Sequence, residues 1–314
     1  MQQPIKFVLL GHVDHGKSTC AGRILMDTGT VQKQEVEKAI KDAELNNMKS
    51  WWLAYLLDVN EDERINGKTV EYTMVPLIYK GYAMQLIDVP GHRQYISEMI
   101  NGTGKADIAV LICSAKKGEV ESGLKGQTYE HLVLARGLGI KSLIVGVNKM
   151  DHESVNWSDE IFQDVKAKIT KLIARLKFQN VQFIPISGLD GTNLAKSTRT
   201  TLMDAILEAG LGLSDSQTHI DAICQTEITA SCIFLNIKSV VSIGYRCVLH
   251  SNFNGKNVLV ECEINNIMGK KPFITKNDKG YIDVQLKLDE SVNLGSFIIL
   301  RSGDTTIGMG RIIE

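Results

Sequence analysis

The sequence predicts an α/β domain with a doubly wound parallel sheet, followed by a small antiparallel β-barrel. Two observations carry this prediction. In the first two-thirds of the 314-residue chain, short apolar runs alternate with segments of helical periodicity, as in a parallel sheet covered on both faces. After Ala209, apolar and polar residues alternate within short runs, which is typical of half-buried antiparallel strands.

Each strand and helix of the α/β domain is predicted from the pattern of apolar residues in its own segment. Continuous apolar runs predict buried strands over Ile5–Leu10, Met84–Val89, Ile108–Ser114, Leu143–Asn148 and Val181–Ile186. Helical periodicity predicts helices over Thr19–Met26, Tyr95–Ile100, Thr128–Gly137 and Asp159–Leu176. We expect Val70–Tyr79 to add one more strand. In such a sheet, ligands bind at the carboxyl ends of the strands.

The C-terminal part is predicted to be a separate β domain. We expect the α/β domain to cover residues 1–212, a polar linker to cover 213–226 and the barrel to cover 227–314. The alternation is clearest in Ile282–Asp289, and Val258–Ile264 shows it as well. About six such strands in so short a segment favour a small barrel, with a sandwich as the alternative.

Composition narrows the functional class. The net charge of −1 argues against an autonomous nucleic-acid binder, so a protein partner deserves at least equal weight. The six cysteines match neither a zinc site nor a disulfide framework, which favours a reducing, cytoplasmic location. No apolar run is long enough to span a membrane, and the N-terminus lacks a signal segment. We therefore expect no membrane association.

The most informative segment is Gly11–Thr19, with the sequence Gly-His-Val-Asp-His-Gly-Lys-Ser-Thr between the first predicted strand and helix. This context is what a phosphate-binding P-loop requires, because its backbone N–H groups point at a polyphosphate. Lys17 is expected to reach the β- and γ-phosphates, and the Ser18 hydroxyl to ligate Mg²⁺. His12 and His15 are interpreted as structural. The nucleotide-binding residues expected here are Val13, Asp14, His15, Gly16, Lys17, Ser18 and Thr19.

Two motifs at later strand ends predict that the nucleotide is GTP or GDP. In Asn148-Lys149-Met150-Asp151, the Asp151 carboxylate can accept hydrogen bonds from guanine N1–H and N2–H₂, a pattern that adenine cannot offer. Asn148 is expected to bond either the base or the P-loop, and the Lys149 stem to pack on the ring. Ser187-Gly188-Leu189 is placed to aim a backbone N–H at guanine O6.

A third group of residues predicts hydrolysis and switching. Asp88 can hold Mg²⁺ through a water, and the Gly91 N–H can contact the γ-phosphate. Thr69, at the end of Glu63–Thr69, is the candidate to close the Mg²⁺ shell and sense the γ-phosphate; the alternative is an ordinary residue that starts a strand. His92 is the catalytic candidate, since it can orient an attacking water; the alternative is a helix-start histidine without a role.

These motifs together resemble the translational GTPases of the alpha-class elongation factor family. Within this family, four further segments are most similar to eukaryotic release factor three and next most similar to the Hbs1-like ribosome-rescue GTPases. These segments are Glu63–Glu71, Ser114–Glu119, Gly126–Thr128 and Val155–Ser158. Val13 matches one leaf of that family's hydrophobic gate, whereas Lys68 stands where the other leaf is apolar. Ile228–Leu235 and Arg301–Gly308 resemble the third domain of release factor three, a barrel that contacts the class-I release factor.

The resemblance implies a ribosome-stimulated GTPase that uses Mg²⁺ and acts with a class-I release factor in translation termination. Residues 210–226 are too few for the second β-barrel that this family normally carries, which argues against tRNA delivery. The alternatives are a GTP-gated, non-catalytic adaptor or decoy, a ribosome-rescue GTPase and a tRNA carrier. The GTPase subunit of sulfate activation has a similar P-loop sequence, but the segments Gly67–Thr69 and Val155–Ser158 match that protein poorly.

Overall fold

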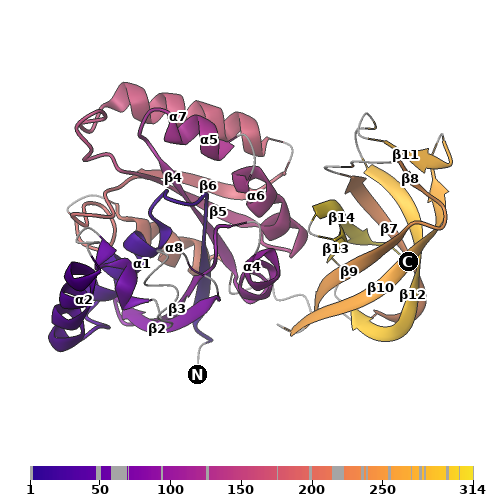
Figure 1. Cartoon of the computed structure of the whole chain (residues 1–314), viewed down its shortest axis with the longest axis horizontal. Helices are drawn as coiled ribbons and strands as arrows, with labels where there is room; N and C mark the ends of the chain where they lie inside the picture. Colours follow the sequence, from indigo (N-terminus) through magenta and orange to yellow (C-terminus); the bar gives the residue numbers. More distant parts are fainter. Residues whose placement is uncertain are drawn as a thin grey trace. The chain divides into compact units, whose positions relative to one another are not determined.

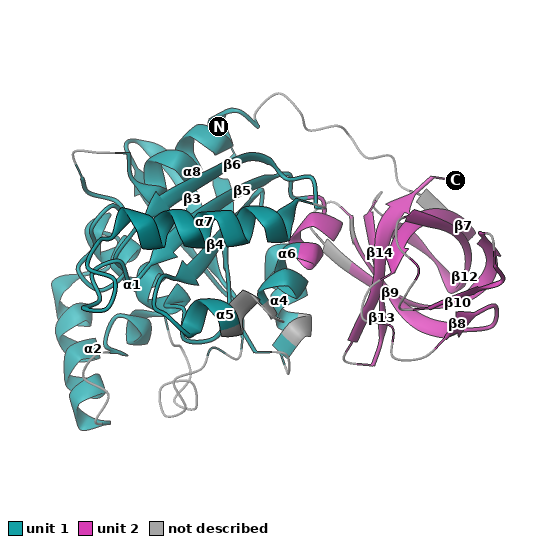
Figure 2. Cartoon of the chain, turned by 90° about the horizontal axis from the view of Figure 1, so that it is seen from above, with its two compact units in different colours: residues 1–132, 140–216 teal, residues 133–139, 217–314 magenta. Residues whose placement is uncertain are grey.

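The computed structural model describes all residues except 1–2, 47–50, 58–68, 70, 93–94, 125–126, 175, 198–199, 214–222, 235–236, 238–239, 254–255, 270, 276–277, 279–280, 295–296, 304 and 314. The chain divides into two compact units, Met1–Leu132 with Ile140–Ser216, and Val133–Gly139 with Gln217–Glu314 (Figure 2). The predicted switch residues Glu63–Lys68 and most of the predicted linker lie outside the described residues.

The first unit is built on a six-stranded sheet in the order β2-β3-β1-β4-β5-β6 (Figure 1). The strands are β1 (Ile5–Leu10), β2 (Thr73–Tyr79), β3 (Tyr82–Asp88), β4 (Ile108–Ser114), β5 (Ser142–Asn148) and β6 (Gln179–Pro185). All neighbours are parallel except β2, which runs antiparallel to β3 at one edge. The predicted doubly wound fold is confirmed, and β2 begins at Thr73 rather than Val70.

Helices cover both faces of this sheet (Figure 1). The described helices of the segment 17–211 are α1 (Lys17–Asp27), α2 (Lys33–Leu45), η2 (Ala54–Leu56), α4 (Ile96–Thr103), α5 (Glu119–Leu124), α6 (Gln127–Gly137), α7 (Asp159–Ile173) and α8 (Leu202–Leu211). Apolar side chains of α1 and α8 form one buried cluster with Phe7 and Leu9 of β1, while α7 lies over the opposite face. The four predicted helices are present; α2, α5 and α8 are additional.

The second unit is a closed barrel rather than a sandwich. Its strand order is β10-β12-β7-β14-β13-β9, and the ring closes because β9 pairs with both β10 and β13. The strands of this unit are β7 (Ile223–Phe234), β8 (Val241–Ser242), β9 (Arg246–Phe253), β10 (Lys256–Met268), β11 (Phe273–Ile274), β12 (Tyr281–Leu294), β13 (Phe297–Ser302) and β14 (Thr305–Ile312).

The predicted alternation is present in the barrel strands. Val284, Leu286 and Leu288 of β12 are buried in the barrel core, whereas Lys287 is exposed. Strand β7 begins at Ile223, inside the segment predicted as linker, and β8 pairs with β11 in a separate two-stranded sheet. In the described part of the chain, every helix is too short or too polar to cross a membrane.

Candidate nucleotide-binding site

The P-loop connects β1 to α1 at the carboxyl edge of the sheet. Gly16 is the N-cap of α1 with φ 89°, in the left-handed region, and a Cβ there would lie 2.4 Å from Asn148 Nδ2. Only glycine satisfies both conditions without strain. Gly16 offers no side-chain acceptor, so the first-turn N–H groups of α1 carry no side-chain cap and face the loop as donors. A helix N-terminus of this kind favours an anion.

Lys17 is folded into the loop. Its Nζ donates a hydrogen bond to the carbonyl oxygen of His12 at 3.0 Å, and the residue is 7% exposed. Burial lowers the pKa of Lys17, and the carboxylates of Asp88 and Asp14 act against this shift. A buried ammonium group that already touches the loop is positioned to exchange its carbonyl partner for phosphate oxygens.

Three oxygen-bearing side chains that were predicted to hold Mg²⁺ come together beside Lys17. Ser18 Oγ donates to Asp88 Oδ2 at 2.9 Å, and it lies 3.2 Å from Thr69 Oγ1. Thr69 precedes β2 and is not part of that strand. Hydroxyl and carboxylate oxygens suit Mg²⁺, which takes about six oxygen ligands, so nucleotide and water oxygens would complete the shell. The residues present therefore fit this metal.

Asn148 joins the P-loop to the predicted base-recognition loop. Its Nδ2 donates to the carbonyl oxygen of His15 at 2.9 Å, and its Oδ1 accepts from the Gly188 N–H at 2.8 Å. The side chain is 2% exposed. Of the two partners that the sequence left open, Asn148 contacts the P-loop in this structure. It thereby holds residues from the ends of β1, β5 and β6 in a single arrangement.

In the loop of residues 187–191, only one backbone N–H lacks an acceptor among the described residues. The Ser187, Asp190 and Gly191 N–H groups bond within the segment 187–192, and that of Gly188 bonds Asn148. The remaining donor is the N–H of Leu189, a residue that is 54% exposed. Because a backbone N–H is a strong donor that requires a partner, Leu189 is the member of this loop that is available to guanine O6.

Glu119 is a site residue that the sequence did not single out. Its carboxylate pairs with Lys149 Nζ at 2.7 Å, and its carbonyl oxygen accepts a hydrogen bond from His15 Nε2 at 3.1 Å. Burial lowers the pKa of His15 to about 4, so the ring is neutral at pH 7. Position 119 begins α5, and that helix was not predicted.

The remaining predicted residues lie at the same edge of the sheet. A Cβ built on Gly91 would lie 2.5 Å from Lys17 Nζ, so the segment after β3 runs directly beside the P-loop lysine. His92 follows it, half-buried, with its ring centroid 6.3 Å from that of Tyr95. Asp151 is half-buried after β5, and Asp14 is exposed on the P-loop. The catalytic role of His92 and the base contact of Asp151 stay predictions.

A mostly parallel sheet with a P-loop, a hydroxyl–carboxylate cluster and a loop with an available backbone donor defines a P-loop nucleotide-binding domain of the GTPase class. The family model described as "Elongation factor Tu GTP binding domain" matches residues 2–211. The match covers more than half of the chain, and the chain belongs to this family.

Two translation factors are among the proteins whose sequences are similar to this chain. The chain is 38% identical over 231 residues to the "Eukaryotic peptide chain release factor GTP-binding subunit" of Schizosaccharomyces pombe, covering 70% of this chain and 34% of that protein. It is 40% identical over 209 residues to "Elongation factor 1-alpha" of Picrophilus torridus, covering 64% of this chain and 49% of that protein. The chain thus spans a third to a half of these relatives. The expected resemblance to translational GTPases is confirmed.

A solved structure matches both units. The fold is similar to that of the Saccharomyces cerevisiae Ski7 GTPase-like domain bound to GTP, with a TM-score of 0.80 and 17% sequence identity. The similarity covers 98% of this chain and 97% of that one. At this identity the match shows a shared fold, an α/β domain followed by a β-barrel.

Proposed function

We propose that this protein is a GTPase that acts on the ribosome together with a class-I release factor or a relative of one. The observation that carries the GTPase proposal is the convergence of Ser18, Asp88 and Thr69 beside the buried Lys17. The release-factor proposal is supported by the name of the Schizosaccharomyces pombe relative, which matches 70% of this chain. The C-terminal barrel is the proposed contact for the partner.

The chemistry follows from the arrangement of the loop. Lys17 and the first-turn N–H groups of α1 would stabilise the negative charge that develops on the phosphate oxygens during in-line attack of water. Ser18, Thr69 and Asp88 would hold Mg²⁺, which would supply positive charge against the phosphate oxygens. His92 would orient the attacking water, because it directly follows Gly91, which lies against Lys17.

Thr69 would couple the nucleotide to the segment that precedes β2. Its hydroxyl lies 3.2 Å from Ser18 Oγ, so it shares the phosphate end of the site with the first turn of α1. With GTP bound, a threonine at this position would also contact the γ-phosphate, and hydrolysis would remove that contact, which is how a segment can be ordered by GTP and released on hydrolysis. We propose Thr69 as this sensor.

The test is GTP hydrolysis by the wild type and by His92→Ala, with and without ribosomes. We expect slow turnover alone and a ribosome-stimulated rate that falls by about a hundredfold in the variant, since general acid–base positioning contributes on this scale. His152→Ala is the matched control, because its ring bonds Ser154 on the turn after β5. Absence of a stimulated rate, or a rate indifferent to His92→Ala, would contradict the proposal.

A second candidate is a GTP-gated adaptor that binds the release factor without hydrolysing GTP. It is favoured by the direct passage from α8, which ends at Leu211, to β7, which begins at Ile223. The intervening residues are too few for another barrel. Capture of a class-I release factor in the presence of GTP, without ribosome-stimulated turnover, would favour this candidate over the first.

A further inference from the structure

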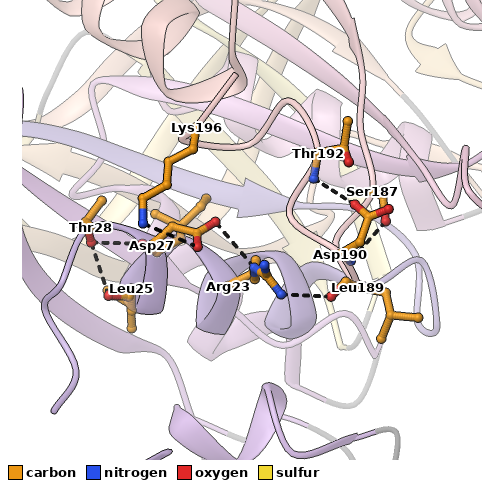
Figure 3. Close-up of polar contacts among 10 residues, drawn as sticks. Arg23, Leu25, Asp27, Thr28, Ser187, Leu189, Asp190, Thr192 and Lys196 are labelled. Atoms are coloured by element: carbon orange, nitrogen blue, oxygen red, sulfur yellow. Dashed lines mark hydrogen bonds and ion pairs between the residues drawn. The ribbon is translucent and has the colours of Figure 1, made fainter. Parts of the chain in front are cut away.

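The loop that holds the available Leu189 N–H is tied to α1 by one side chain. Arg23 Nη1 donates to the carbonyl oxygen of Leu189 at 3.1 Å, and Arg23 Nε donates to Asp27 Oδ2 at 3.3 Å (Figure 3). The Arg23 side chain is 20% exposed and that of Asp27 is 10% exposed. Asp27 also lies 3.9 Å from Lys196 Nζ. The guanidinium is thus held by its own helix while it contacts the loop.

These contacts fix the peptide groups on both sides of the Leu189 N–H. On one side, the Gly188 N–H donates to Asn148 Oδ1. On the other side, the Leu189 carbonyl accepts from Arg23, and the Asp190 N–H donates to Ser187 Oγ at 3.2 Å. Since each residue has only two soft backbone dihedrals, holding both neighbouring peptides sets the direction of the N–H between them.

The loop is shaped to admit the guanidinium. Gly191 has φ 87°, and a Cβ there would lie 2.6 Å from Arg23 Nε. A larger residue at this position would push the guanidinium off the loop. A guanidinium is planar and carries several N–H donors, so it can serve the Asp27 carboxylate and the Leu189 carbonyl together, whereas a lysine ammonium is a point donor.

We propose that Arg23 is a positioning residue for guanine recognition. By holding the Leu189 carbonyl, it keeps the Leu189 N–H directed at the O6 atom of the base. Helix α1 begins with Lys17 and Ser18, so the helix proposed to bind the phosphates also positions the loop of residues 187–191 through Arg23. This inference rests on the guanine site of the proposed function, and it adds a residue that touches neither base nor phosphate.

The test measures the affinity of the full chain for three nucleoside diphosphates by titration calorimetry. GDP is compared with 6-thio-GDP, which replaces O6 with a weaker acceptor and keeps N1–H and the amine. It is also compared with inosine diphosphate, which keeps O6 and lacks the amine. If a residue acts through O6, its substitution changes the ratio of the affinities for 6-thio-GDP and GDP. The same substitution leaves the ratio of the affinities for inosine diphosphate and GDP unchanged.

For Arg23→Gln we expect the affinity for GDP to fall about fivefold and the preference over 6-thio-GDP to fall by a similar factor, as for loss of one neutral hydrogen bond, that from the Leu189 N–H to O6. The preference over inosine diphosphate should stay unchanged. The GDP affinity of Arg23→Lys and its preference over 6-thio-GDP should lie between those of the wild type and of Arg23→Gln. If Arg23→Gln does not fold, Arg23→Lys takes its place in the test. Lys196→Gln is the matched control, because it removes a cation near Asp27 without contacting Leu189.

Two results would overturn the inference. One is an unchanged GDP affinity in the Arg23 variants. The other is an equal loss for all three nucleotides, which indicates a general structural role. A wild-type chain that binds none of the three would instead overturn the guanine site itself, so the two failures are distinguishable.

Discussion

Replacement of Asn148 by alanine tests whether the two halves of the site depend on one buried amide. The amide donates to the His15 carbonyl at 2.9 Å and accepts from the Gly188 N–H at 2.8 Å, and the residue is 2% exposed. Alanine removes both bonds and leaves two buried backbone groups without their partner. The perturbation therefore acts on the P-loop and on the base loop together.

The magnitude follows from those two groups. Leaving a buried donor or acceptor unsatisfied costs about 1–3 kcal/mol, so for the two groups we expect the free energy of unfolding of the α/β unit to fall by about 2–6 kcal/mol. This is a large part of the total stability of a domain, which is about 5–15 kcal/mol. GDP affinity should fall as well, because Gly188 and Leu189 lose the contact that orients them.

Urea unfolding followed by tryptophan fluorescence measures this change selectively. The three tryptophans, Trp51, Trp52 and Trp157, all belong to the first compact unit, so the signal reports that unit and not the barrel. Asn46→Ala is the control, since Asn46 is exposed and its side-chain amide donates a long hydrogen bond, of 3.4 Å, to the Tyr55 hydroxyl. It should cost less than about 1 kcal/mol. A loss of similar size in both variants would refute the reasoning.

Three further predictions concern the P-loop and its neighbours. Ser18→Ala removes an oxygen beside Asp88, so the Mg²⁺ concentration for half-maximal GDP binding should rise about tenfold in a magnesium titration; an unchanged midpoint would exclude Ser18 as a ligand. Gly91→Ala places a methyl group 2.5 Å from Lys17 Nζ, so GTP affinity should fall about tenfold, and retained affinity would show that Lys17 can move aside. Burial lowers the pKa of His15 from its usual 6.5 to about 4. Above pH 6.5 the titration of His15 does not change the free energy of unfolding. As the pH falls towards 4, the unfolded state binds a proton that the native state excludes, and the free energy of unfolding falls by about 3 kcal/mol. His15→Gln should flatten this dependence in urea unfolding at pH 7 and pH 4.5; equal slopes would contradict it.

The strands were predictable because burial on both faces of a parallel sheet leaves little choice of residue. The predicted bounds of β1 and β4 match the structure at both ends, since each is a continuous apolar run. Helix α8, over Leu202–Leu211, was not predicted because a mostly apolar helix lacks the polar face that makes helical periodicity visible. The start of α8 is marked by a capping box between Thr201 and Asp204, and both residues of this signal are visible in the sequence.

The roles of Arg23 and Glu119 could not be predicted in the same way. Arg23 contacts Leu189, which is 166 residues away along the chain, and Glu119 contacts His15 across 104 residues. Arginine and glutamate on a helix are most often solvated, so neither residue type indicates a site. Only the order of strands in the sheet brings these partners together.

The sequence by itself determined the class of nucleotide site that this protein is expected to carry. Gly16 and Lys17 have the spacing that a P-loop requires, and Asp151 has the acceptors that the predicted guanine contact requires, because short-range backbone geometry and hydrogen-bond chemistry depend on residue type. The tertiary structure decided how these parts are connected. Asn148 bonds the P-loop, and Leu189 is left as the free backbone donor of its loop among the described residues. Such contacts depend on which strand ends lie side by side, and that is a property of the whole folded sheet.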